Sequence, residues 1–157
     1  MSLSVRSVNL GFSTGIFQTA GWMKLKWEDE RYRWEPDKYE NIESVNLPFS
    51  KDWSPDVLLY NGLEDKFMYN KVGILEHTGE ITYIIALYTQ SSCSPNFTDF
   101  PWGIQVCSLK FGSWINTQYR VEYRLPSNSS VGLNEFESGV GWKIVNTSSR
   151  LQSVQHS

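Results

Sequence analysis

Short runs of alternating apolar and polar residues, separated by turn residues, dominate the chain. Residues 21–27 read GWMKLKW, so Met23, Leu25 and Trp27 share one face of an expected strand. Residues 79–88 read GEITYIIALY and alternate in the same way after a Thr-Gly turn. A period of two residues is typical of strands that bury one face.

Two later segments continue this pattern and are also expected to be strands: residues 106–114 (VCSLKFGSW) and 119–125 (YRVEYRL). No segment keeps an apolar period of 3.6 residues over three turns, so no long helix is expected. The six prolines fall between the alternating runs, where a missing N–H costs no ladder hydrogen bond. The chain is therefore predicted to be an all-β, antiparallel β-sandwich, with the polar tail 146–157 as an edge strand or a frayed end.

Composition narrows the possible partners. The 157 residues suffice for a single domain, and a net charge of −3 argues against nucleic acid, whose phosphates require a positive surface. The longest apolar run, residues 81–88, is far too short to cross a bilayer. Aromatic residues make up 15% of the chain, seven of them Trp, and such residues both favour strands and line ligand pockets.

Cys93 and Cys107 are the only cysteines, with thirteen residues between them. A zinc site needs about four ligands, and two thiols with two distant histidines make a poor set. A redox dithiol usually has two intervening residues. We therefore expect a structural disulfide, which stabilises the fold by roughly 3 kcal/mol in the chain-entropy model for a loop of this size.

Three N-x-S/T triplets, at Asn96, Asn128 and Asn146, are candidate glycosylation sites. Together with a single possible cysteine pair, they favour the secretory pathway and an extracellular location, because disulfides persist in oxidising compartments.

Patterns that would indicate catalysis are weak. Glu28, Asp29 and Glu30 are adjacent carboxylates, but successive strand residues point to opposite faces. His77 has no Ser or Asp arrangement that would make a triad, and no glycine-rich phosphate loop is present. We expect no enzyme activity, no cofactor and no metal site.

Four motifs, in order along the chain, resemble one known family. Phe100-Pro101 in the second half of the cysteine loop, with Gln105 two residues before Cys107, resembles the motif Phe-Pro-Phe-Asp-x-Gln-x-Cys. The other matching segments are residues 27–42 (W-x-D-x-x-L-x-W-x-P-x-x-Y-x-x-I), 52–62 (W-x-P-D-x-x-L-Y-N) and 109–114 (LKFGSW). Roughly from Val8 to Trp142, the chain resembles the extracellular ligand-binding domain of Cys-loop, nicotinic acetylcholine-type pentameric ligand-gated channels and the soluble acetylcholine-binding proteins.

The resemblance implies an immunoglobulin-like β-sandwich and a single ligand-binding domain over residues 1–157, apparently truncated before the ligand-capping loop and any membrane helices. It implies a secreted protein or the ectodomain of a plasma-membrane receptor, attached to the membrane only through a transmembrane domain absent from this chain. The implied partners are a small, acetylcholine-like cation and further copies of the chain in a homopentamer.

The resemblance also implies the site residues. Tyr60 and Trp114 would face Trp22, Thr82 and Ile84 of a neighbouring subunit. The face of an aromatic ring attracts a quaternary ammonium by about 0.5–2 kcal/mol. From the residues alone, Trp114 could instead be a core residue, and Trp22, among lysines, could pack against a neighbouring segment.

The match is accompanied by departures from the family. Gly103 stands where the family motif has Asp, and Asn116 where the family has Tyr; the link near Gly15 to Gly21 is shortened, and the family's N-terminal helix is missing. A secreted carbohydrate-binding β-sandwich, whose surface tryptophans stack on sugars, is the alternative function that the sequence leaves open.

Overall fold

Antiparallel strands form most of the regular structure. The computed structural model describes residues 1–49, 53–68, 72–116, 120–126, 131–138 and 141–152. Its strands are β1 (Ser2–Gly11), β2 (Ile16–Glu28), β3 (Ser44–Pro48), β4 (Leu58–Leu59), β5 (Gly62–Met68), β6 (Val72–Glu76), β7 (Glu80–Ser92) and β8 (Phe111–Gly112). Two short 3-10 turns, η1 (Glu30–Tyr32) and η2 (Pro36–Lys38), connect β2 to β3. No long helix occurs in these ranges, in agreement with the missing 3.6-residue period in the sequence.

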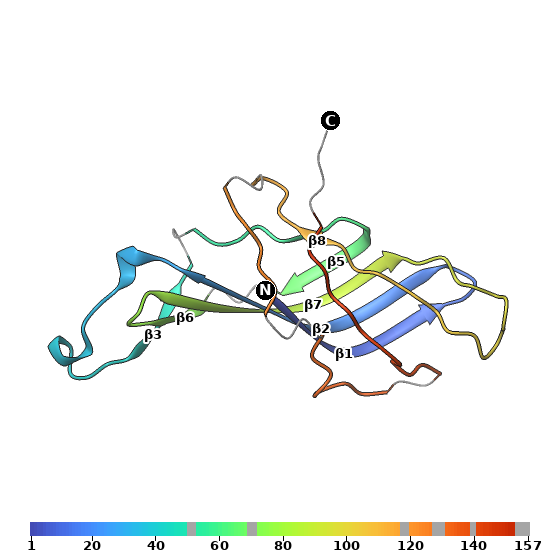
Figure 1. Cartoon of the computed structure of the whole chain (residues 1–157), viewed down its shortest axis with the longest axis horizontal. Helices are drawn as coiled ribbons and strands as arrows, with labels where there is room; N and C mark the ends of the chain where they lie inside the picture. Colours follow the sequence, from blue (N-terminus) through green and yellow to red (C-terminus); the bar gives the residue numbers. More distant parts are fainter. Residues whose placement is uncertain (50–52, 69–71, 117–119, 127–130, 139–140, 153–157) are drawn as a thin grey trace.

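The central strand is β7, which pairs with three others (Figure 1). On one edge it pairs with β2 along its whole length, from Glu80 opposite Glu28 to Ser92 opposite Ile16. Its other edge is shared, with β6 beside its first residues and β5 beside its second half. The resulting six-stranded sheet has the order β1-β2-β7-β6-β3, with β5 as the sixth strand beside β7. Strands β4 and β8 form a separate pair.

The apolar alternation produces the core. Met23 and Ile85 are completely buried, and with Leu25, Tyr83 and Leu87 they form the inner face of β2 and β7. Val57 completes this cluster from the β4 side, and Phe111 and Tyr123 pack against it from the second half of the chain. Segments from both halves thus cover one face of the large sheet, which confirms the predicted β-sandwich and the strands expected at 21–27 and 79–88.

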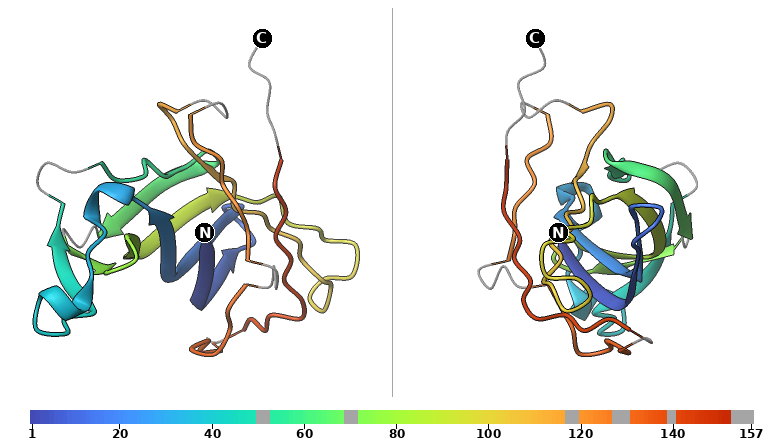
Figure 2. Two further views of the ribbon diagram at one scale, coloured as in Figure 1. Left: turned by 60° about the vertical axis from the view of Figure 1, so that its left-hand side comes forward. Right: turned by 90° about the vertical axis from the view of Figure 1, so that its right-hand side faces the viewer.

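The strands expected in the second half are largely absent. Of residues 106–114 only Phe111–Gly112 is a strand, and the described residues 120–125 and 146–152 contain none. Exposed and half-buried residues still alternate along 102–111 and 120–126, so the side chains keep the expected two-sided pattern. A ladder also needs a partner backbone in register, and within the described chain only Leu58–Leu59 supplies one. Figure 2 shows these segments running alongside the large sheet.

The predicted disulfide is formed between Cys93 and Cys107. Its loop lies against the turn between β1 and β2, where the Phe12 ring contacts the rings of Phe97, Phe100 and Trp142 at centroid distances of 5.2 to 5.8 Å.

Two of the candidate glycosylation residues, Asn96 and Asn146, are exposed, and the third, Asn128, lies outside the described residues. Glycosylation therefore stays a prediction.

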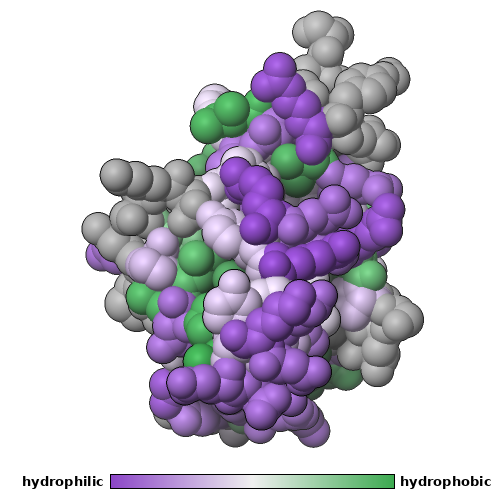
Figure 3. All heavy atoms as spheres, turned by 90° about the vertical axis from the view of Figure 1, so that its left-hand side faces the viewer, coloured by the Kyte–Doolittle hydropathy of each residue, from purple (hydrophilic) through white to green (hydrophobic). Residues whose placement is uncertain are grey.

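The end of the molecule that carries η1, η2 and the tips of β3 and β6 is mostly hydrophilic, with small separate apolar areas (Figure 3). Ion pairs such as Arg33–Glu28 and Lys38–Glu35 lie in this region. Within the described residues, no helix has the length and apolar character needed to cross a membrane.

Candidate functional site

Tyr60 and Trp114 lie side by side on the surface. Tyr60 directly follows β4 and Trp114 lies just after β8, so the pairing of these two strands brings the rings together. Their centroids are 6.5 Å apart and the ring planes are tilted by 41°. Tyr60 is 46% exposed and Trp114 73% exposed, so Trp114 is a surface residue rather than a core residue. The Tyr60 hydroxyl donates a hydrogen bond to the Ser113 carbonyl oxygen, which orients the phenol ring.

Asp56 holds the turn that carries Trp114. Its Oδ2 accepts from the backbone N–H groups of Trp114 at 3.0 Å and Ile115 at 2.8 Å. Its Oδ1 accepts from the Ser113 hydroxyl at 2.6 Å and from the Asn116 side-chain amide at 2.7 Å. A carboxylate with about four lone-pair sites can accept all four bonds at once. One side chain from the Trp-Ser-Pro-Asp segment therefore fixes the conformation of residues 113–116.

This arrangement also sets the ionisation of Asp56. Burial by itself would raise the pKa of this carboxyl, but the hydrogen bonds from Ser113, Ile115 and Asn116 favour the charged form and outweigh it. The pKa of Asp56 consequently lies below its ordinary value, and the group is ionised at neutral pH.

Asn61 provides a second connection between the same segments. Its amide nitrogen donates to the Ser108 carbonyl oxygen at 2.8 Å, and its side-chain oxygen accepts from the Lys110 backbone N–H at 2.9 Å. The backbone N–H of Tyr60 donates to the Lys110 carbonyl oxygen at 2.8 Å. These bonds extend the short β4–β8 pairing and hold together the two backbone segments that carry the Tyr60 and Trp114 rings.

The three remaining candidates lie on another part of the molecule, on the outward face of β2 and β7. Trp22 is opposite Ala86, and Ile84 and Thr82 are opposite the two lysines of β2. Paired residues share a face of a sheet, so these side chains form one surface as the sequence predicted. Trp22 and Ile84 are exposed, whereas Thr82 is only 9% exposed and offers little contact area.

Glu135 is a neighbour of Trp22 that sequence reasoning missed. Its Oε2 accepts a hydrogen bond from the Trp22 indole Nε1 at 3.1 Å, across 113 residues of sequence. No local pattern around residue 135 could have indicated this contact, because it depends on how a loop of the second half returns to β2. The carboxylate both orients the indole and places a negative charge beside it.

Within the described residues, no hydrogen bond, ion pair or ring contact joins Tyr60 or Trp114 to Trp22, Thr82 or Ile84. The described residues also contain no group of three or more His, Cys, Asp or Glu side chains that could hold a metal ion. The predicted site residues thus lie in two separate aromatic groups, which are called half-sites below. Each group has a nearby carboxylate: Asp56 beside Trp114 and Glu135 beside Trp22.

Comparison with known proteins gives a consistent result. The family model described as the neurotransmitter-gated ion-channel ligand binding domain matches residues 1–157. The chain is 33% identical over 143 residues to the neuronal acetylcholine receptor subunit alpha-6 of Pan troglodytes, which covers 90% of this chain and 29% of that subunit. It is 33% identical over 132 residues to the subunit alpha-3 of Rattus norvegicus, covering 83% of this chain and 26% of that subunit. The chain thus spans less than a third of the length of these relatives.

Proposed function

Because this chain belongs to the neurotransmitter-gated ion-channel ligand-binding domain family, we propose that it binds a small organic cation between two copies of itself. The resemblance found in the sequence motifs is confirmed. The family consists of ligand-gated channel receptors rather than enzymes, and its ligand-binding domain is extracellular. Because the family model matches the whole chain, we no longer favour the alternative of a carbohydrate-binding β-sandwich.

The observation that carries the proposal is the exposed pair Tyr60 and Trp114, with the turn at Trp114 held by hydrogen bonds to Asp56. Two electron-rich ring faces attract a weakly hydrated cation more than an equally large neutral group. Asp56 is ionised and accepts a hydrogen bond from the backbone N–H of Trp114, so its negative charge close to this residue also favours a cation. An acetylcholine-like ligand fits this chemistry and the names of the relatives.

The second half-site supports the location at an interface. Trp22 and Ile84 expose apolar surface on the outward face of β2 and β7, and Glu135 adds a negative charge there. A partner that presented Tyr60 and Trp114 to this face would enclose the cation among three rings. A homopentamer supplies this arrangement five times, and the same geometry serves a channel subunit or a soluble binding protein.

Ligand charge provides the test. Tetramethylammonium and acetylcholine, with their neutral tert-butyl isosteres, are titrated against the chain by calorimetry. The ammonium members are expected to bind several-fold more tightly, because cation–π attraction acts only on the charged form. Equal affinity of charged and neutral members would contradict a cation site and leave an apolar cleft.

The assembly is tested separately by light scattering over a range of protein concentrations. We expect the mass to rise toward that of five chains, and the apparent ammonium affinity to rise with it, because each half-site is incomplete alone. Monomers at every concentration, with unchanged ligand affinity, would contradict binding between subunits.

A further inference from the structure

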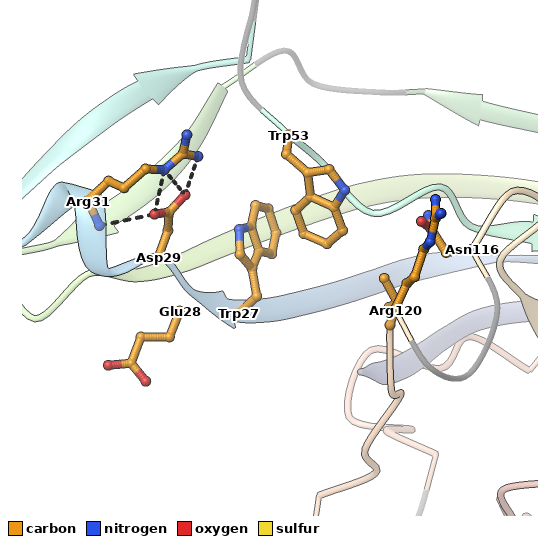
Figure 4. A pocket seen from close by; sticks show the side chains of 8 residues that line it. Trp27, Glu28, Asp29, Arg31, Trp53, Asn116 and Arg120 are labelled. Atoms are coloured by element: carbon orange, nitrogen blue, oxygen red, sulfur yellow. Dashed lines mark hydrogen bonds and ion pairs between the residues drawn. The ribbon is translucent and has the colours of Figure 1, made fainter.

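A hollow of about 450 Å³ is lined by none of the five residues that the sequence predicted to bind a ligand. It is formed where the end of β2 and the η1 turn approach the segment that begins at Trp53. Its remaining lining residues are Asn116, Arg120 and Val121 (Figure 4). A small organic molecule fits a space of this size.

Two indole rings form its apolar wall. Trp27 and Trp53 meet edge to face, with centroids 5.8 Å apart and ring planes at 84°. Trp27 is fixed from behind by ring contacts with Phe49 and Tyr83. Trp53 is 44% exposed, so part of its ring remains open. This wall suits a flat aromatic ligand, because aromatic pairs gain about 0.5–1.5 kcal/mol beyond the area that they bury.

Among the described charged side chains that line the hollow, one positively charged group has no ion-pair partner. Arg31 and Asp29 form a two-point ion pair, with Nε to Oδ1 at 2.9 Å and Nη2 to Oδ2 at 2.6 Å. Hydrogen bonds from Arg31 lower the pKa of Asp29, so this pair is neutral as a whole. Glu28 points away from the rings in Figure 4 and pairs with Arg33.

Arg120 is the remaining charge. Among the residues that the structure describes, its guanidinium has no hydrogen-bond or ion-pair partner, and it extends beside Asn116 on the far side of the two indoles from Asp29 (Figure 4). Guanidinium groups bind carboxylates by two parallel hydrogen bonds, which are among the stronger polar contacts in proteins.

We propose that this hollow is a second ligand site, which binds a small aromatic carboxylate with its ring against Trp53 and its carboxylate on Arg120. The ligand carries the opposite charge to the cation expected beside Trp114, so the two sites are distinguishable by ligand charge alone. Asn116 lines the hollow and also donates to Asp56, which brings the proposed site next to the turn that holds Trp114.

The test is a calorimetric titration of the whole chain with naphthalene-2-carboxylate and with its neutral amide, naphthalene-2-carboxamide. We expect one carboxylate per chain, bound at least fivefold more tightly than the amide. Arg120→Gln should remove this difference, and Arg150→Gln, which changes another exposed arginine of the C-terminal segment, should leave it intact. Trp53→Ala should weaken both ligands about tenfold; if that variant does not fold, the comparison of Arg120→Gln with Arg150→Gln still decides.

Equal affinity for acid and amide, or an unchanged preference in Arg120→Gln, would overturn the proposal. So would loss of carboxylate binding in Trp114→Ala, because the ligand would then occupy the other aromatic site. The titration uses no ammonium ligand and requires no assembly, so its result is independent of the function proposed above.

Discussion

The Asp56 carboxylate accepts a hydrogen bond from the backbone N–H of Trp114 at 3.0 Å, although the two residues are 58 positions apart in sequence. Three further bonds from Ser113, Ile115 and Asn116 complete the cluster. A charged acceptor with four donors holds its turn rigidly, since each hydrogen bond to a charged group contributes about 1.5–3 kcal/mol when it is kept from water. The position of the Trp114 ring therefore depends on a residue outside the predicted site.

Replacing Asp56 by Asn should damage this turn. The amide has one oxygen instead of two, and its NH2 group would face N–H donors. We expect the free energy of unfolding in urea to fall by about 1–3 kcal/mol, with weaker ammonium binding. Asp37→Asn in η2, which changes an exposed carboxylate, is the matched control and should change neither quantity.

The same variant should change how the free energy of unfolding depends on pH at acidic pH. The folded pKa of Asp56 is lowered, so its contribution is present above the ordinary value of 3.8 and is lost as the pH falls through the lower folded value. Asp56→Asn should flatten this part of the profile. An identical acid profile for wild type and variant would show that the cluster contributes no net stability.

Trp114→Ala should cost about 1–3 kcal/mol of ammonium binding, in the range for a residue that anchors a ligand. Trp114→Phe should cost less, because it keeps a weaker ring. Trp102→Ala is the control, since this tryptophan is 90% exposed and belongs to neither half-site. Equal losses for Trp102→Ala and Trp114→Ala would contradict the assignment of Trp114.

Glu135→Ala should weaken ammonium binding, because Trp22 loses the acceptor that orients its indole and the neighbouring negative charge disappears. Glu135→Gln keeps an acceptor without the charge and should give an intermediate affinity. Since the contact is on the surface, stability should change by no more than about 0.5 kcal/mol. A displaced NMR signal of the Trp22 indole N–H in Glu135→Ala, absent in the control Glu137→Ala, would confirm the contact directly.

The double variant Cys93→Ser, Cys107→Ser should lose roughly 3 kcal/mol of unfolding free energy, because the open loop gains conformational entropy in the unfolded chain. Denaturation of wild type and variant, both purified without reductant, measures this difference. Mass spectrometry that finds two free thiols in wild-type protein secreted from an oxidising compartment would contradict the disulfide.

The Tyr123 hydroxyl should lose its proton only at a pH well above that of an ordinary tyrosine. Burial, with a contribution from the charge of Asp56, raises its pKa to about 12 from the ordinary value of 10.0. A raised folded pKa means that its contribution to stability is complete below pH 10 and is lost as the pH rises toward 12. The unfolding free energy should therefore fall more steeply in this window for wild type than for Tyr123→Phe, while Tyr39→Phe, an exposed site, should behave like wild type.

The local sequence pattern was sufficient to predict two of the main strands, the disulfide and the family. Alternation predicted β2 and β7, since Met23 and Ile85 on the inner face are buried and Trp22 and Ile84 on the other face are exposed. Spacing and elimination predicted the Cys93–Cys107 disulfide. The order of the motifs indicated the family. These features could be predicted because strand alternation and loop motifs each depend on residues that are close together in the sequence.

Strand pairing in the second half of the chain, the burial of individual side chains and the long-range contacts could be established only from the tertiary structure. Alternation could not show that residues 120–125 lack a ladder, because pairing depends on a partner strand and not on the side chains of one segment. It could not show that Thr82 is covered while Ile84 on the same face is exposed. The contacts Asp56–Trp114 and Glu135–Trp22 join residues 58 and 113 positions apart. Such hydrogen bonds leave no periodic trace in a sequence, because they arise only when packing of the apolar faces has already brought distant segments together.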